Sequence, residues 1–473
     1  MLRVVYANVL AERVGDENGI RAREWRDAMA AHGGLCKTLR AQRQAGQLAF
    51  MDLPNDQATP AAIEAFAGRV QGRFRHVVQI GIGGSALGAS ALYTALGCPM
   101  SCRAGRTGGG AAKRPGPLPP CLHVLDNVDP EETRALLATI DPRETLFHVV
   151  TKSGETVETI ATFLVCLQAL RDRVGRDWKS HLVFSTDPEK GFLRRLARKE
   201  KIEAFAIPPG VGGRFSVLSP AGLVPAALAG IDIRRLLAGA DRMESVCSRT
   251  RAEDNPAFVA ALIHYLLDTK RGKTMAVFMP YARSLRDIAD WFVQLWAESL
   301  GKRLSLADKV VHAGQTPIRA LGATDQHSVV QLFAEGPNNK MFVFVEVERF
   351  RGDVEIPPLF PDDETTGFLG NQTLGRLLNA EKRGTEVALT DAGRPSYTLR
   401  LSTISPETVG ELLYFLEVQT AFAGMLYGVN AFDQPGVEAG KKAAFALLGR
   451  KGYGDLRRTI ERRFGEGGRH VVD

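Results

Sequence analysis

Short apolar runs alternate with helical patterns between residues 76 and 207. Each run has the length of a strand, and the stretches between them repeat apolar residues at the spacing of an amphipathic helix. Apolar strands separated by helices are typical of a parallel sheet that is covered on both faces. Strands are predicted at 76–83 (running into a glycine loop), 121–126, 145–150, 181–186 and 203–207, and helices at 85–96, 130–140, 156–170 and 188–199.

A second unit of the same kind follows a mostly helical stretch at 220–270. It begins with the apolar run 274–280, includes the run 341–347, and leads to a long apolar helix predicted at 406–427. At about 150 residues per domain, 473 residues correspond to two or three domains. We therefore predict an α/β fold with two doubly wound domains, divided into an N-terminal helical extension (1–70), a first domain (71–230), a second domain (231–430) and a C-terminal helical segment with a basic tail (431–473).

The segment 98–121, CPMSCRAGRTGGGAAKRPGPLPPC, interrupts the first unit between a predicted helix and a predicted strand. Glycine, proline, arginine and alanine dominate it, and it has no apolar periodicity. Such a segment cannot bury enough apolar surface to offset the entropy that is lost on ordering. We predict that 98–120 is a disordered insert on the surface.

Basic residues outnumber acidic ones by 60 to 53, which gives a net charge of +7 at pH 7. The surplus gathers in 98–120, in 171–201 and in the C-terminal tail. Nucleic-acid binding is one interpretation, but no nucleic-acid motif accompanies the charge. Solvated basic faces, with a field that attracts anionic substrates, are the simpler interpretation. We therefore expect no nucleic-acid partner.

Hydropathy and cysteine content indicate the cellular compartment in which the protein is expected. No apolar run approaches the roughly 18 residues that span a bilayer, and acidic residues come too early in the N-terminal segment for a signal peptide. The six cysteines contain no CxxC pair, which reduced thiols in a cytosolic compartment explain most simply. We expect a cytoplasmic protein with no membrane partner.

The glycine loop Gly81-Ile82-Gly83-Gly84-Ser85-Ala86 follows the first strand and opens a helix. Backbone N–H groups and the helix dipole attract a phosphate at such a turn, so Gly84 and Ser85 are candidate phosphate ligands. The run also satisfies the dinucleotide fingerprint G-x-G-x-x-[GA], and Asp126 ends the next strand, where a ribose-binding acid would lie. This loop alone leaves NAD, a sugar phosphate and a tight turn without a ligand as alternatives.

A second loop, Thr151-Lys152-Ser153-Gly154-Glu155-Thr156, follows the strand 145–150 and again opens a helix. Its three hydroxyls suit a monophosphate, although hydroxyls are also common as simple helix caps. A nicotinamide enzyme would need only the first loop, whereas two such loops on neighbouring strands favour one shared anion site. Thr151, Lys152, Ser153 and Thr156 are therefore candidate substrate ligands.

An arginine follows two glycines in Gly212-Gly213-Arg214, and Ser219 then caps a helix that begins at Pro220. Arg214 is held beside backbone that a ligand can approach closely, so it could stabilise a negative oxygen. An ordinary surface ion pair is the alternative.

Glu298 lies in the last turn of an amphipathic helix predicted at 284–300, one turn after Gln294. The negative end of the helix dipole disfavours the charged carboxylate, which suits a general base. A solvated glutamate at a helix end is the plainer alternative. Gln294 shares this helix edge and is a candidate substrate contact.

Two further candidates lie in short polar segments. His327 occurs in 322–328, and Lys441 lies on the second turn of a helix predicted to begin at Pro435, just after Gln434. A lone histidine is more often structural than catalytic, and a lysine on a helix surface is usually solvated. The nine histidines show neither HxH nor HExxH spacing, so we expect no metal site.

Taken together, these segments resemble the phosphoglucose isomerase family, which is built from two sugar-isomerase (SIS) domains of flavodoxin-like topology. The resemblance runs from about 77 to about 448, and Gly154 is similar to bacterial members. It rests on GIGGSALG, TKSGETVET, GVGGRFSVLSPAGLVPAAL, QLWAESLGK, ATDQHSVVQLFAEGP and NAFDQPGVEAGK, in this order.

The resemblance implies an isomerase that interconverts glucose 6-phosphate and fructose 6-phosphate in glycolysis and gluconeogenesis without a cofactor. Glu298 matches the catalytic base, and Arg214 matches the group that stabilises the enediolate. His327 matches the ring-opening acid and base, Lys441 its neighbour at the ring oxygen, and Gln434 a substrate contact. The family is dimeric, which implies a homodimer in which His327 serves the partner's site. A non-catalytic SIS-domain regulator and an NAD-dependent oxidoreductase are the alternatives.

Overall fold

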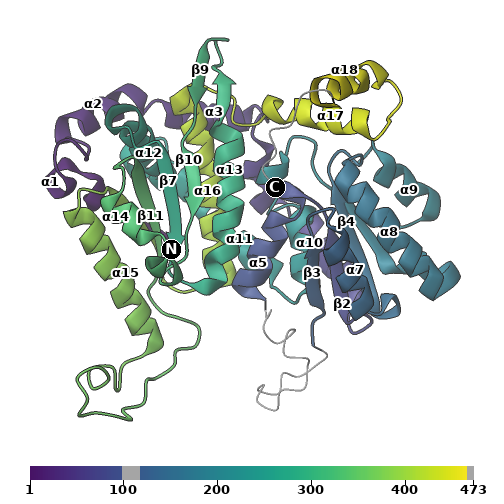
Figure 1. The fold of residues 1–473 in the computed structure, drawn as a ribbon, viewed down its shortest axis with the longest axis horizontal. Coiled ribbons are helices and arrows are strands. Elements are labelled where there is room, and N and C mark those ends of the chain that lie inside the picture. The colour runs from purple at the N-terminus through teal and green to yellow at the C-terminus, as the bar shows by residue number, and fades with distance from the viewer. Residues whose placement is uncertain (98–117, 466–473) are drawn as a thin grey trace.

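Two parallel sheets organise the computed structural model, which describes residues 1–97 and 118–465 (Figure 1). The first sheet has the strand order β3-β2-β4-β5-β6, and all of its pairings are parallel. Its strands are β2 (His76–Ile80), β3 (Cys121–Leu125), β4 (Thr145–Thr151), β5 (Leu182–Thr186) and β6 (Glu203–Ala206). Its helices are α5 (Leu87–Leu96), α7 (Pro130–Thr139), α8 (Val157–Val174), α9 (Phe192–Glu200) and α10 (Pro220–Leu228), with the 3₁₀ turns η3 (Gly83–Ser85), η4 (Pro142–Glu144), η5 (Gly175–His181) and η6 (Gly213–Phe215). The alternation predicted from the apolar pattern is confirmed.

The second sheet has the order β1-β12-β11-β7-β10. Its strands are β1 (Arg3–Val5), β7 (Met275–Pro280), β10 (Thr316–Arg319), β11 (Lys340–Val347) and β12 (Ser396–Leu401). Its helices are α11 (Ile233–Cys247), α12 (Pro256–Arg271), α13 (Arg286–Leu300), α14 (Val330–Glu335), α15 (Leu374–Asp391) and α16 (Pro406–Tyr427), with the turns η7 (Ala252–Asp254), η8 (Arg283–Leu285) and η9 (Thr324–His327).

The N-terminal segment departs from the expected helical extension. Its first strand, β1, pairs antiparallel with β12 and forms the edge of the second sheet. A strand of three residues carries too little periodicity to be recognised in the sequence. The rest of the segment is helical: η1 (Ala7–Val9), α1 (Ala11–Val14), α2 (Ala22–His32), α3 (Leu35–Gln44), η2 (Ala49–Asn55) and α4 (Ala58–Val70).

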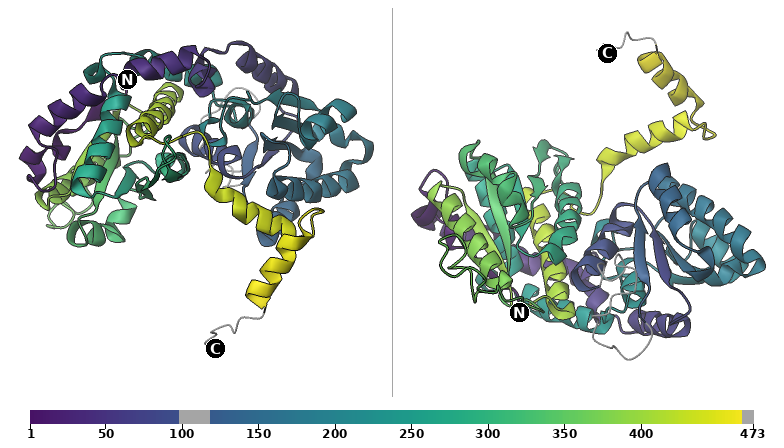
Figure 2. Two further views of the ribbon diagram at one scale, coloured as in Figure 1. Left: turned by 90° about the horizontal axis from the view of Figure 1, so that it is seen from above. Right: turned by 60° about the horizontal axis from the view of Figure 1, so that its bottom comes forward.

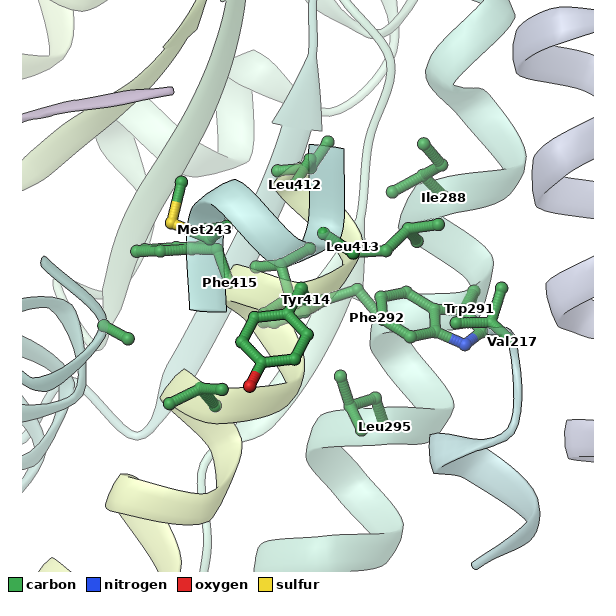
Figure 3. Close-up of a cluster of buried hydrophobic side chains, with 14 of the residues drawn as sticks. Val217, Met243, Ile288, Trp291, Phe292, Leu295, Leu412, Leu413, Tyr414 and Phe415 are labelled. Atoms are coloured by element: carbon green, nitrogen blue, oxygen red, sulfur yellow. The ribbon is translucent and has the colours of Figure 1, made fainter. Parts of the chain in front are cut away.

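Alternate residues of each strand point to opposite faces of its sheet, and both faces are apolar. Val78 and Ile80 of β2 pack on the outer helices α8 and α9, whereas Val77 belongs to a core shared by both sheets. The helices α11, α13 and α16 line this shared core, as Figure 3 shows for a group of their side chains and neighbours. Each half is thus an α/β sandwich, which confirms the predicted fold class, and the shared core joins the two halves.

The segment 302–323 connects the end of α13 to η9. It forms the antiparallel pair β8 (Lys302–Leu304) and β9 (Val310–Ala313), followed by β10 at the edge of the second sheet. A Cβ on Gly314 would lie 2.7 Å from the carbonyl oxygen of Leu300. The start of β10 therefore lies against the end of α13.

The C-terminal segment projects from the body in both views of Figure 2. It contains the turn η10 (Pro435–Val437) and the helices α17 (Glu438–Leu447) and α18 (Gly454–Gly465). The helix that was expected to start at Pro435 thus begins with a 3₁₀ turn, and α17 follows at Glu438.

Three further predictions from the sequence can be compared with the structure: the disordered insert, the reduced cysteines and the absence of a membrane-spanning segment. The predicted insert 98–120 falls outside the described residues except for 118–120. Cys36, Cys166 and Cys247 are free and buried, but Cys121 is disulfide-bonded, so the expectation of reduced thiols throughout is wrong there. No helix in the described ranges is long and apolar enough to cross a membrane.

Candidate active site

A buried arginine lies at the junction of the two halves. The Arg214 side chain is only 2% exposed, and its Nη1 lies 3.4 Å from a carboxylate oxygen of Glu298. The same nitrogen donates to the Gln434 side chain at 3.1 Å. Nε donates to the Ser299 hydroxyl at 2.7 Å, and Nη2 donates to the backbone carbonyls of Ala431 and Asp433.

These partners match the five N–H donors of a guanidinium, so Arg214 has a partner for each of them. Burial lowers the pKa of Arg214 below its usual range, and the charge of Glu298 opposes this shift. The ordinary surface ion pair is therefore wrong for Arg214, because the cation is enclosed by three segments of the chain: η6, the end of α13 and residues 431–434.

Glu298 lies in the last turn of α13, as predicted, and its side chain is 27% exposed. Gln294 donates to its carboxylate at 3.4 Å from one turn earlier. Gly83, in the glycine loop, has a φ of +56°, and a Cβ there would lie 2.8 Å from the Gln294 amide nitrogen. The glycine loop, Gln294, Glu298 and Arg214 are therefore joined by an unbroken series of contacts.

Gly84, in the glycine loop, packs against the backbone of Gly213 and Arg214. A Cβ on Gly84 would collide with the backbone carbonyl of Gly213, and the Ser216 hydroxyl donates to the Gly84 carbonyl at 3.3 Å. Gly84 thus admits the chain's own backbone. Gly83, the glycine that a dinucleotide fingerprint reserves for the approach of the pyrophosphate, faces the Gln294 amide instead. This packing argues against the NAD alternative.

The second loop gathers its hydroxyls as expected. The Thr151 hydroxyl lies 2.8 Å from that of Thr156 and 3.4 Å from that of Ser153. Although Thr156 is the N-cap residue of α8, no side chain caps this helix. Its N-terminal N–H groups are thus not satisfied by a side-chain cap, which is the arrangement that binds anions. Lys152 donates to the Pro209 carbonyl at 2.6 Å, and burial lowers its pKa.

Strand order places the two loops side by side at the carboxyl end of the first sheet. The strands β3 and β4 lie on opposite sides of β2, so the direction in which the sheet is wound reverses between β2 and β4. Ligands of doubly wound sheets bind at the carboxyl ends of the strands at such a switch point. Ile80 pairs with Val149 at this end, and the glycine loop and the hydroxyl loop follow directly.

Lys302 was not predicted. Its side chain is 5% exposed, and its Nζ donates to the carbonyls of Glu298 and Asp433, each at 2.7 Å. Burial and then the neighbouring Arg214 lower its pKa. The lysine of QLWAESLGK, four residues after Glu298, was the available signal, but its contact with residue 433 is invisible in the sequence.

His327 and Lys441 are not brought to this cluster. His327 ends η9, which follows β10, and it is exposed. Lys441 is on the projecting α17, where it is half exposed and lies 3.1 Å from Glu438. In the described ranges, no group of three or more His, Cys, Asp or Glu residues could hold a metal ion.

A buried arginine beside a carboxylate, together with two loops of the phosphate-binding type at the switch point of a doubly wound sheet, is typical of an α/β enzyme that acts on a phosphorylated small molecule. The model of the phosphoglucose isomerase family matches residues 60–348 and 384–453. The chain belongs to this family.

Individual relatives agree with the family match. The chain is 50% identical over 424 residues to a glucose-6-phosphate isomerase of Carboxydothermus hydrogenoformans, and the matched residues make up 89% of each sequence. It is 47% identical over 406 residues to one of Rubrobacter xylanophilus, covering 85% of this chain and 90% of the relative. Among solved structures, a hypothetical protein of Thermus thermophilus superimposes with a TM-score of 0.82 at 39% identity, covering 95% of this chain and all of the other.

Proposed function

We propose that the protein is a glucose-6-phosphate isomerase that interconverts glucose 6-phosphate and fructose 6-phosphate. The observation that carries the proposal is the contact of Arg214 with both Glu298 and Gln434 beside the phosphate crevice. A non-catalytic sugar-phosphate regulator would need the loops but not this buried pair. The relatives named as glucose-6-phosphate isomerases support the same substrate.

The reaction moves one proton between neighbouring carbons. The phosphate is bound by Ser85, Thr151, Ser153 and Thr156, which holds the carbon chain against the base. Glu298 removes the proton from C2 of the open-chain aldose, and a cis-enediolate forms. Arg214 stabilises its negative charge, and the protonated Glu298 then returns the proton to C1 while the hydroxyl proton passes from O2 to O1. Gly84, Lys152, Gln294 and Gln434 complete the substrate contacts, and no step calls for a cofactor.

Ring opening needs a second acid–base group, which we assign to His327 of the other subunit in a homodimer. Glu298 lies near the end of α13, beside the start of β10, whereas His327 follows the end of β10. Arg319 at the end of β10 pairs with Asp290 of α13, and Glu298 lies eight residues further along this helix, or about 12 Å, so the two side chains of one chain lie apart. An isologous dimer would bring each His327 to its partner's Glu298.

Lys441 belongs to the same step in this proposal, at the ring oxygen. Its helix is joined to the cluster through Gln434, which contacts Arg214, so movement of α17 about this point would carry Lys441 toward the substrate. We place the enzyme in the cytoplasm, where glycolysis and gluconeogenesis would supply both of its substrates.

A coupled assay tests the activity directly. Purified protein is given fructose 6-phosphate, and glucose 6-phosphate is detected by its oxidation with an NADP-dependent dehydrogenase. Formation of glucose 6-phosphate that disappears in the Glu298→Gln variant is expected. Purified, folded protein without turnover would overturn the proposal.

A further inference from the structure

A row of buried polar side chains crosses the first sheet beneath the glycine loop. Gln79 on β2, His148 on β4 and Ser185 on β5 are fully buried. Gln79 is the direct register partner of His148, and Ser185 lies on the next strand. Burying three polar groups costs free energy unless each of them is hydrogen-bonded, so their pairing shows what they hold.

Gln79 connects this row to the loop. Its amide nitrogen donates to the Ser85 carbonyl at 2.6 Å and, more weakly, to the Ala221 carbonyl at 3.4 Å. The second acceptor needs such a donor. Ala221 lies four residues before Pro225 in α10, and proline has no N–H to complete the helical hydrogen bond.

The other groups are ordered by this contact. Because the Gln79 amide nitrogen faces two carbonyls, its oxygen faces His148 Nδ1 at 3.2 Å, and Nδ1 must carry the hydrogen. His148 Nε2 then accepts from the Ser185 hydroxyl at 2.8 Å, a shorter contact than that of the same hydroxyl with the Pro220 carbonyl at 3.3 Å. Burial lowers the pKa of His148 to about 3, so the ring is neutral at physiological pH and keeps this pattern of donors and acceptors.

The Ser85 carbonyl is the point at which the loop closes on itself. A Cβ on Gly81 would lie 2.5 Å from this oxygen, and the Ser85 N–H donates to the Ile82 carbonyl at 3.1 Å. A donor that holds the Ser85 carbonyl from below therefore orients the peptide units that follow Gly81. Their N–H groups are the ones that a phosphate at the crevice would meet.

We propose that Gln79, His148 and Ser185 are positioning residues that hold the Gly81–Ala86 loop in its phosphate-binding shape. The proposal rests on the sugar-phosphate function assigned above. Glu298 and Arg214 do not contact this row, so its loss weakens phosphate binding and leaves the proton-transfer groups in place.

The test compares the variants Gln79→Leu and His148→Phe with a control, His181→Phe. His181 is a buried histidine of the same sheet, but it lies at the amino end of β5, where it donates to the Thr145 carbonyl at 2.9 Å. Calorimetric titration with inorganic phosphate gives a dissociation constant, and the coupled assay gives kcat and KM for fructose 6-phosphate. Thermal melting confirms that each variant is folded.

In Gln79→Leu, we expect both the phosphate dissociation constant and KM to rise about five- to tenfold, with kcat within about threefold of wild type. His148→Phe should follow, and His181→Phe should leave both binding constants unchanged. Ser185→Ala, which removes only the last hydroxyl, should raise them about twofold and serves if the larger changes prevent folding. Unchanged phosphate affinity in folded Gln79→Leu, or an equal rise in His181→Phe, would overturn the proposal. Wild-type protein without isomerase activity would instead refute the proposed function, while the phosphate titrations would still test the row.

Discussion

The guanidinium of Arg214 lies 3.4 Å from the carboxylate of Glu298. Arg214 precedes α10 in the first half of the molecule, whereas Glu298 lies in the last turn of α13 in the second half. Gln294 is the only other side chain of the described residues that is hydrogen-bonded to this carboxylate. The Glu298 side chain therefore stays 27% exposed while the buried guanidinium balances its charge.

This geometry predicts the result of Glu298→Gln. The amide is nearly isosteric and can still accept a hydrogen bond, but it cannot take up a proton. We expect kcat to fall by about 10³-fold or more, with KM within about threefold of wild type. Glu335→Gln is the matched control, because Gln331 donates to Glu335 at 2.9 Å from one turn earlier on α14, but no arginine pairs with it. A Glu298→Gln variant that retains a tenth of wild-type kcat would refute the assignment.

Lys302 ties the end of α13 to the segment that carries Gln434, so Lys302→Met should loosen the site without removing a catalytic group. We expect kcat to fall about tenfold, because two charge-assisted hydrogen bonds are lost at the Glu298 and Asp433 carbonyls. Lys340→Met is the control, since Lys340 is also buried and donates to backbone at the Pro337 carbonyl. Equal losses of thermal stability with kcat lowered only in Lys302→Met would support the prediction, and unchanged kcat in that variant would contradict it.

The fold could be predicted from the sequence where apolar residues repeat with a clear helical period and where capping residues mark the ends of a helix. The helix expected at 406–427 has these bounds in the structure, and Ser219 accepts the Ala221 N–H at the cap expected before Pro220. Short edge strands such as β1 and β10 were missed because strands of three and four residues carry too little periodicity to be recognised.

The candidate site was likewise predictable only where its residues lie in a local sequence pattern. Arg214, Glu298 and the hydroxyl loop were recognisable because each follows a strand or ends a helix with a telling residue type. Lys302 and Gln79 were not recognisable in the sequence. Lys302 contacts Asp433, 131 positions away, and Gln79 contacts Ala221, 142 positions away, and no local pattern encodes such contacts.

The hydroxyl loop should determine affinity for the phosphate group. Replacing both Ser153 and Thr156 with alanine removes two of the three clustered hydroxyls and leaves Thr151 without its 2.8 Å partner. We expect KM for fructose 6-phosphate to rise at least tenfold, with inhibition by inorganic phosphate weakened in parallel. Steady-state kinetics with phosphate as a competitive inhibitor measure both constants. An unchanged KM in the double variant would show that the phosphate binds elsewhere.

Glu417 on α16 should make stability depend on pH. Its carboxyl group is fully buried, neither oxygen has a hydrogen-bond partner among the residues that the structure describes, and burial raises its pKa well above the usual value. The folded protein therefore holds a proton that the unfolded chain releases above about pH 4.5, so this group lowers the free energy of unfolding as pH rises. Glu417→Gln removes this dependence. Urea unfolding at pH 5.5, 7.0 and 8.5 should show a stability advantage of the variant that grows with pH, and a constant difference would contradict the prediction.

The proposal that two subunits share each active site makes the sharpest prediction, because two inactive variants should then restore each other. Glu298→Gln and His327→Ala are each expected to be inactive alone. If His327 serves the partner's site, a heterodimer of the two variants carries one doubly defective site and one intact site. Random exchange makes about half of the dimers heterodimeric, so about a quarter of wild-type activity should return after mixing and reassembly.

The control for this mixture is the exchange itself. Differently tagged subunits, purified in series, show whether heterodimers have formed, and a mixture of Glu298→Gln with Glu298→Gln/His327→Ala should stay inactive because no site is intact. If His327 serves its own subunit, every site in the first mixture keeps one defect. Tagged heterodimers that form and remain inactive would therefore rule out the shared site while leaving the role of Glu298 untouched.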